Sequence, residues 1–175
     1  TLFGHGIYIG TKHNLIEGSS FHDNWGIGVH IYNAPGGTQN NVVRNTRVYR
    51  NGRRPERQFS GLILTKGEGN SAYNNLVYEN GGLGIFVGYG AVNSTVYQNT
   101  VYGNGAGGIN VNGAYDGSQH AIVTNNISYG NGGDQLYDDA VGTILSNNLT
   151  TDPQFVNASA GDFHLQASSP AIDAG

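Results

Sequence analysis

Residues 18–24, 45–51, 74–80, 98–104 and 125–131 read GSSFHDN, NTRVYRN, NNLVYEN, QNTVYGN and NNISYGN. Each stretch ends on asparagine, with a tyrosine or a histidine two places earlier. Short segments of the pattern glycine–apolar–any–apolar lie between them, at residues 6–9, 26–29, 61–64, 84–87 and 108–111. From the second segment onward, the opening glycines are 23 to 35 residues apart. Such self-similarity is typical of stacked structural repeats.

Each repeat predicts about three short strands separated by tight bends. In residues 7–9, alternation places Ile7 and Ile9 on one face and Tyr8 on the other. The corresponding inward columns are expected to be Ile27, Leu62, Ile85 and Ile109, and Val29, Leu64, Val87 and Val111. Second strands are expected near residues 15–16, 42–43, 95–96, 122–123 and 144–145, and third strands carry Phe21, Val48, Val77 and Val101 inward. One coil alone cannot bury such a face, so the coils must stack.

Asparagine and aromatic residues form further columns in the repeat. Asn24, Asn51, Asn80, Asn104 and Asn131 share one position, and Thr46, Asn75, Asn99, Asn126 and Asn148 share another. Asparagine side chains bond backbone groups at bends and one another along a stack. The aromatic column His22, Tyr49, Tyr78, Tyr102 and Tyr129 predicts either a sugar-binding platform or a stabilising ladder of rings. Recurrence in every coil favours a structural role for all three columns.

With these repeats, the chain resembles the right-handed parallel β-helix family, the pectate-lyase-like secreted bacterial proteins that act on carbohydrates. The resemblance implies an all-β fold, a right-handed single-stranded parallel β-helix of about six coils over residues 5–150. A non-repeat closing segment follows at 151–175, within a single domain spanning 1–175. The N-T-D and R-x-K motifs of polygalacturonase-type hydrolases are absent, as is the D-P-H-D/E motif of mannuronan epimerases. The resemblance therefore implies a fold more specifically than an activity.

Charge divides the chain into two parts. All eight lysines and arginines lie at or before Lys66, where three carboxylates leave a net charge of +5. Residues 67–175 carry nine carboxylates and neither lysine nor arginine. This asymmetry bears on partners rather than on fold. The sequence has no cysteine and no apolar run long enough to span a bilayer, which argues against a disulfide framework and a membrane anchor.

The second coil departs most from the repeat. It carries one insertion at residues 32–40 and another at 52–60, and the latter holds Arg53, Arg54 and Arg57. Guanidinium groups suit carboxylate or sulfate ligands, although a solvated loop with locally paired arginines is the alternative. Nucleic acid is a weaker partner for an acidic chain without RNA-binding signatures. These arginines are the predicted binding groups for an acidic polysaccharide.

Outward positions after the first strands supply the rest of the predicted site. Stacking is expected to place His30, Thr65, Lys66 and Tyr89 on adjacent coils. A uronate lyase must neutralise the substrate carboxylate, abstract a proton and protonate the leaving oxygen. Lys66 or His30 is the candidate base, and an arginine is the candidate neutralising group. Tyr89, Tyr32 or Tyr115 is the candidate acid, with Asn110 and Asn112 as further substrate-binding residues. Any surface of this size offers some such groups, so an accidental grouping is the alternative.

The sequence thus predicts a polysaccharide lyase that acts by β-elimination on a uronate-containing glycan. A non-catalytic glycan-binding or structural module is the alternative, and a glycoside hydrolase or epimerase is a further one. No metal site is predicted with certainty, but Glu68 and Asp116 have the oxygen ligands that calcium prefers. We expect a secreted or cell-surface location. We also expect self-association through an uncapped N-terminal coil, because such a coil exposes a sheet edge.

Overall fold

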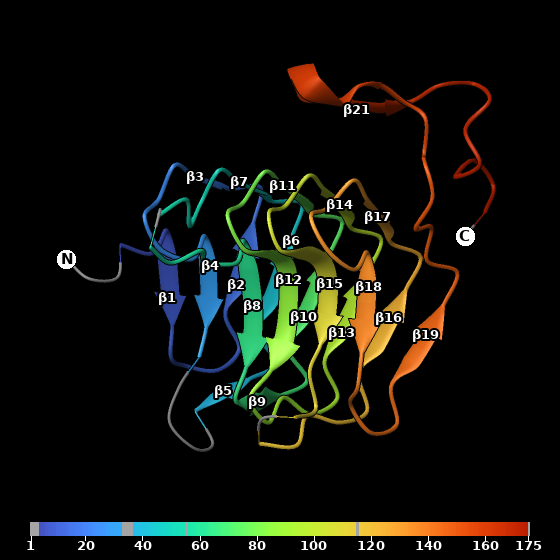
Figure 1. Ribbon diagram of the computed structural model, residues 1–175. Coiled ribbons are helices and arrows are strands. Elements are labelled where there is room, and N and C mark those ends of the chain that lie inside the picture. The colour runs from blue at the N-terminus through green and yellow to red at the C-terminus, as the bar shows by residue number, and fades with distance from the viewer. Residues whose placement is uncertain (1–3, 33–36, 55, 115, 175) are drawn as a thin grey trace.

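The computed structural model describes residues 4–32, 37–54, 56–114 and 116–174, and the chain winds into a stack of coils with three sheet faces (Figure 1). The first sheet contains β1 (Ile7–Ile9), β4 (Val29–Ile31), β8 (Leu62–Thr65), β12 (Leu83–Gly88), β15 (Gly107–Val111) and β18 (Leu136–Asp138). The second contains β2 (Leu15–Glu17), β6 (Val42–Arg44), β10 (Ser71–Tyr73), β13 (Thr95–Tyr97), β16 (Ile122–Thr124) and β19 (Ile144–Ser146). The third contains β3 (Ser20–His22), β7 (Arg47–Tyr49), β11 (Leu76–Tyr78), β14 (Thr100–Tyr102) and β17 (Ile127–Tyr129).

Every neighbouring pair in these three sheets is parallel, and each strand pairs with its equivalents in the adjacent coils. The predicted right-handed parallel β-helix is therefore confirmed. The sheets have six, six and five strands, so complete three-strand coils are slightly fewer than the six expected. A short parallel pair, β5 (Thr38–Gln39) and β9 (Gly67–Glu68), flanks the stack.

The apolar core fills the space between the sheets. Inward residues such as Leu62, Ile85 and Ile109 of the first sheet are completely buried. The second sheet contains a strand that the sequence pattern did not predict, β10, whose inward residue is Ala72. Its one small apolar residue, between Ser71 and Tyr73, is a weaker signal than the apolar pairs at residues 15–16, 42–43, 122–123 and 144–145.

One predicted register is wrong. The pattern aligned Val29 with Leu64, but β4 pairs Val29 with Leu62 and Ile31 with Leu64. The strand therefore begins two residues later than expected. The reason is the glycine that packs beneath the asparagine column: a Cβ on Gly28 would lie 2.7 Å from Nδ2 of Asn51. Glycine is required there by close approach, and the glycine at 26 is not its equivalent.

The asparagine columns have the predicted structural role. In one column the Nδ2 of Asn51 donates to Oδ1 of Asn80 at 3.0 Å, and Asn80 donates to Asn104 at 2.9 Å. These amides are almost completely buried, so each bond satisfies a group that would otherwise be costly to bury. A third column, which the sequence reading missed, begins with the bond from Asn14 to Asn41 at 2.8 Å. All three columns therefore belong to the scaffold.

The C-terminal segment covers part of the third sheet. Its strands β20 (Phe155–Asn157) and β21 (Asp162–Leu165) form an antiparallel pair joined by the 3-10 turn η1 (Ala158–Ala160), above β11 and β14 in Figure 1. The Tyr49 and Tyr78 rings stack 4.8 Å apart, and Phe163 packs against Tyr78 at 5.0 Å and Tyr102 at 5.6 Å. Rings covered by the chain's own segment favour the stabilising ladder over a sugar platform.

The end of the stack that holds β18 and β19 exposes apolar side chains. Val141 is 71% exposed and Ile144 is 56% exposed. At the other end, residues 1–3 lie outside the described residues, and self-association through that end stays a prediction. Within the described part of the chain, no helix is long and apolar enough to cross a membrane.

Candidate functional site

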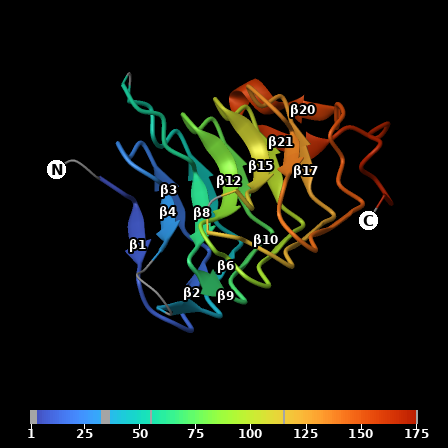
Figure 2. The ribbon, with the colours of Figure 1, turned by 60° about the horizontal axis from the view of Figure 1, so that its bottom comes forward.

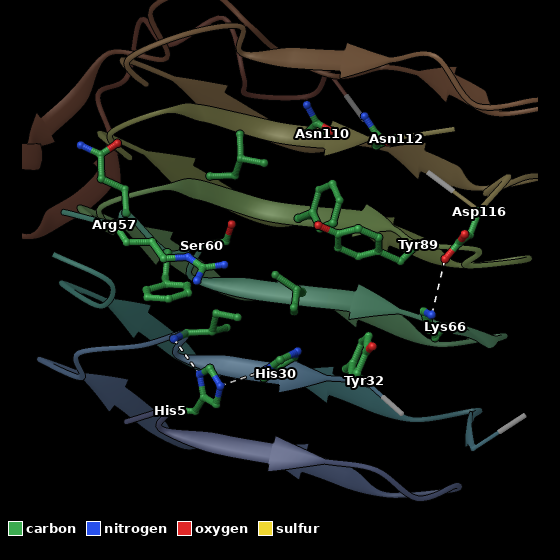
Figure 3. A pocket seen from close by; sticks show the side chains of 16 residues that line it. His5, His30, Tyr32, Arg57, Ser60, Lys66, Tyr89, Asn110, Asn112 and Asp116 are labelled. Carbon is green, nitrogen blue, oxygen red and sulfur yellow. Dashed lines mark hydrogen bonds and ion pairs between the residues drawn. The ribbon is translucent and has the colours of Figure 1, made fainter. Parts of the chain in front are cut away.

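The outer face of the first sheet is hollowed into an open groove of about 850 Å³ (Figure 3). Its floor comes from outward residues of β8, β12 and β15, including Ile63, Phe86 and Asn110. One wall is the loop before β8, which rises from the edge of the stack in Figure 2. The full lining is His5, Ile27, His30, Tyr32, Arg57, Gln58, Phe59, Ser60, Ile63, Lys66, Leu83, Phe86, Tyr89, Asn110, Asn112 and Asp116.

His30 lies at the N-terminal end of this groove, in contact with a second imidazole. Nδ1 of His30 is 3.2 Å from Nε2 of His5, and the ring centroids are 4.6 Å apart in an edge-on arrangement. Tyr8 packs edge-on against His30 at 4.8 Å. Burial, together with the neighbouring His5, lowers the pKa of His30 to about 4. His30 is therefore neutral at physiological pH.

Lys66 lies at the side of the groove where β8 ends, next to Tyr32. Its Nζ is 3.4 Å from Oδ2 of Asp116 and 5.7 Å from the centre of the Tyr32 ring. Tyr89 occupies the equivalent corner of the next coil, and both residues have left-handed backbone, with φ of 51° and 52°. Asn45, Asn74, Gln98 and Asn125 share this backbone at other bends, so it belongs to the coil rather than to the groove.

Thr65 does not join this surface, which corrects the prediction that His30 and Thr65 share it. His30 pairs in register with Ile63. Thr65 is completely buried, and its hydroxyl donates to the backbone carbonyl of Ile31 at 2.8 Å. The two-residue register error explains the difference, because it had aligned His30 with Thr65.

The sequence matches the family described as "Right handed beta helix region" over residues 2–161, which is most of the chain. The chain belongs to this family. The crystal structure of pectate lyase Pel9A superposes with a TM-score of 0.59 over 95% of this β-helix and 61% of that chain, at 19% identity. At this identity the likeness shows the fold alone. No curated protein matches the sequence.

The three arginines that were predicted to bind the ligand have different surroundings in this β-helix. Arg57 lines the groove and lies over the Phe59 ring at 5.1 Å. Arg53 instead donates from Nε to the carbonyl of Glu79 at 3.1 Å, and Arg54 lies over the Trp25 ring at 4.9 Å. The backbone bridge between Arg53 and Gln58 folds this loop into a hairpin, so successive arginines face different directions. Arg53 and Arg54 are thus not groove residues, whereas Arg57 is.

Asn110 and Asn112 line the far end of the groove. The two side chains lie on the same face of the chain because they are two residues apart in and just after β15. Their carboxamide oxygens are shielded from water, and neither has a hydrogen-bond partner among the described residues. Two shielded acceptors of this kind suit a ligand that brings hydroxyl groups. Tyr115, the remaining predicted binding residue, lies outside the described residues.

The residues suggested for calcium are engaged elsewhere. Asp116 faces Lys66, and Oε1 of Glu68 accepts a hydrogen bond from Asn93 at 3.1 Å. Within the described residues, no group of three or more histidine, aspartate or glutamate side chains is arranged to hold a metal. The donor set does not fit a calcium site.

Sequence reasoning missed His5 and Phe86 as groove residues. No neighbour of His5 in the sequence implicates it in a site. Phe86 is the outward residue of β12, in register with Ile63 and Asn110. An apolar residue at an outward position of a strand was the available signal.

Proposed function

We propose that this β-helix binds an acidic polysaccharide in the groove over the first sheet and cleaves it by β-elimination beside a uronate. The observation that carries the proposal is the placement of two cations, Arg57 and Lys66, on opposite sides of one groove (Figure 3). They flank the four-residue strand β8, which is about 13 Å long at 3.3 Å per residue. The apolar and amide groups of the floor between them suit sugar rings and hydroxyls.

The elimination assigns one role to each side of the groove. Arg57 binds the carboxylate of a uronate on its own side of the groove, about one strand length from Lys66, and so holds the glycan in register. On the other side, Lys66 in its neutral form removes the C5 proton of a second uronate, and the freed electron pair forms a double bond between C4 and C5. The bond from C4 to the glycosidic oxygen breaks, and Tyr89 protonates the departing oxygen. The proton that Lys66 has gained then passes through water to Tyr89, which restores both groups.

The contact between Lys66 and Asp116 sets the condition under which this reaction runs. The Asp116 carboxylate lies 3.4 Å from Nζ of Lys66 and competes with the substrate for this side chain. Catalysis therefore requires Lys66 to leave Asp116 and reach the C5 proton. A ligand carboxylate that displaces Asp116 would bind Lys66 as a cation instead.

A second candidate function follows from the same contact. If Lys66 stays charged, Arg57 and Lys66 bind an acidic glycan from the two sides of the groove without cleaving it, as a binding module would. The low pKa of His30 also favours this candidate, because it makes His30, one of the two predicted bases, a weak proton acceptor. A glycoside hydrolase or epimerase is a further candidate that the reaction products would identify.

Incubation with pectate, alginate and glycosaminoglycans tests these candidates. A lyase produces unsaturated uronate ends that absorb in the ultraviolet, a hydrolase produces saturated reducing ends, and an epimerase changes composition without cleavage. We expect unsaturated product, reduced about a hundredfold or more by Lys66→Ala. Binding without product on any of these glycans would support the module and contradict the lyase.

The Asp116→Asn variant separates a base from a binding cation. Removal of the carboxylate releases Lys66 from its ion pair, so a lyase with this base should cleave the glycan faster in Asp116→Asn than in the wild type. If Lys66 only binds the glycan, Asp116→Asn strengthens binding and leaves the cleavage rate unchanged. Lys12→Ala is a matched control, since Lys12 is an exposed lysine remote from the groove lining.

A further inference from the structure

The hydrogen bonds of His5 determine which of its nitrogens carries the proton. The backbone N–H of Ile27 donates to Nδ1 of His5 at 2.9 Å. A backbone amide can only donate, so Nδ1 must provide a lone pair. Burial lowers the pKa of His5, which favours the neutral ring. Neutral His5 therefore carries its single proton on Nε2.

The state of His5 then determines that of His30. Nε2 of His5 is 3.2 Å from Nδ1 of His30, and because His5 holds its proton there, His5 is the donor. Nδ1 of His30 must accept, which leaves the only proton of neutral His30 on Nε2. The hydrogen bonds therefore run from the backbone amide of Ile27 to His5 and from His5 to His30, and the donor of each bond is fixed.

The surroundings of His30 hold the ring in this orientation. Tyr8 from β1 packs against it at 4.8 Å, and Tyr32, just after β4, packs against it at 5.5 Å. In Figure 3 one nitrogen of His30 faces His5 and the other points away, toward the groove. Within the described part of the chain, no residue forms a hydrogen bond with that second nitrogen. Its N–H is available to a ligand.

We propose that His30 is a specificity-determining residue whose Nε2–H is a permanent hydrogen-bond donor to a ligand oxygen in the groove. The identity of the ligand as an acidic glycan rests on the proposed function, but the state of the ring does not. His30 selects a hydroxyl, ring or carboxylate oxygen at this end of the groove. It does not accept a proton, because its one lone pair is occupied by His5.

Nitrogen NMR of the histidine rings tests the proton positions without any ligand. In protein labelled with ¹⁵N-histidine, we expect the Nε2–H form for both His5 and His30. His30 should remain neutral as the pH falls through its ordinary pKa of 6.5. The titratable or charged groups nearest the ring are His5, Tyr8 and Tyr32, with Lys66 beyond Tyr32. A proton on Nδ1 of His30, or titration near 6.5, would overturn the assignment.

Two variants test the contact with the ligand, with galacturonate oligomers as the first probe. His30→Phe keeps an aromatic ring but has no donor, and we expect its binding to be about tenfold weaker, with KM raised more than kcat is lowered. His30→Gln retains an N–H and should recover part of the affinity. His22→Gln on the third sheet is the control, because His22 stacks on Tyr49 far from the groove lining.

The outcomes separate this proposal from the proposed function. Unchanged binding by His30→Phe contradicts the ligand contact even if the glycan is cleaved. Loss of an entire limb of the pH–rate profile in His30→Gln contradicts it as well, since that result identifies a general base. If no glycan binds but both rings have the expected protons, the glycan assignment fails and the fixed donor stands.

Discussion

The outer faces of the first and third sheets are built from the same coils but differ in regularity. On the third sheet, one aromatic position repeats from His22 to Tyr129, and the C-terminal segment covers part of it. On the first sheet, the outward position holds Tyr8, His30, Ile63, Phe86, Asn110 and Tyr137 in successive coils. The first face is irregular and lines the groove, whereas the third is periodic and partly covered by the C-terminal segment.

This difference between the two faces indicates where a ligand site can be expected in a repeat protein. A side chain that recurs in each coil contacts its own equivalents, so its role is satisfied by the stack. A side chain that differs from its equivalents can still pack on them, as Tyr8 does on His30, but the stack does not satisfy all of its polar groups, as Asn110 shows. The same residue type, asparagine, occurs in both situations, and this makes the contrast measurable.

Asn80→Ala and Asn110→Ala compare one residue type in the two settings. Asn80 accepts from the backbone N–H and Nδ2 of Asn51 and donates to Val48 and Asn104, so its loss leaves several buried groups unsatisfied. At about 1–3 kcal/mol for each such group, the free energy of unfolding should fall by roughly 3–5 kcal/mol. Asn110→Ala should stay within about 0.5 kcal/mol and weaken glycan binding. Urea unfolding measures both, and equal losses of stability would contradict the contrast.

Phe163→Ala and Phe86→Ala make the same comparison for aromatic rings. Phe163 anchors the C-terminal segment on Tyr78 and Tyr102, so its loss should lower the free energy of unfolding by about 1–2 kcal/mol. Residues 152–174 should also become more susceptible to protease, with glycan binding intact. Phe86→Ala should weaken binding because it removes part of the groove floor. Weaker binding in Phe163→Ala would implicate the third face in ligand recognition.

Arg57→Ala and Arg53→Ala test whether the arginine loop acts through one side chain. Arg57 lines the groove, so its removal should weaken binding of an acidic glycan about tenfold, equivalent to about 1.4 kcal/mol. Arg53 pairs with Glu79 outside the groove, and its removal should leave the affinity nearly unchanged. Calorimetric titration at low salt measures both, and added salt should reduce the difference. Equal effects would place both arginines at the ligand.

The smallest expected change in the free energy of unfolding concerns the exposed ion pair of Asp23 and Arg50 beside the third sheet. Hydrogen bonds from Arg50, and then from His22, lower the pKa of Asp23 below its ordinary value of 3.8. Since the folded state holds this proton less tightly, the stabilisation is present above pH 3.8 and is lost as the pH falls through the lowered pKa. Asp23→Asn should remove this part of the acid dependence of unfolding. Asp134→Asn, which alters an exposed carboxylate, should leave it in place.

Repetition explains why the fold could be predicted and much of the site could not. The asparagine column from Asn24 to Asn131 reports inter-coil contacts directly, because equivalent residues touch one another. Groove residues such as His5 and His30 meet through the register between two coils, and a shift of two residues at Gly26 and Gly28 misplaced that register. The sequence also gave no means to separate Arg57 from Arg53, since the hairpin turns them to different sides.

The asparagine columns also give the stack an electrical direction. Each side-chain carbonyl accepts from the coil before it, as Asn51 does from Asn24 and Asn104 does from Asn80, so the carbonyl dipoles are aligned. Aligned amide dipoles add, as they do in a helix, with the negative end here toward the N-terminal coils. Residues 1–66 carry a net charge of +5 and residues 67–175 carry nine negative charges, so the formal charges oppose this polarity at both ends. A variant with acidic residues in the N-terminal coils and basic residues in the C-terminal coils would lose that compensation.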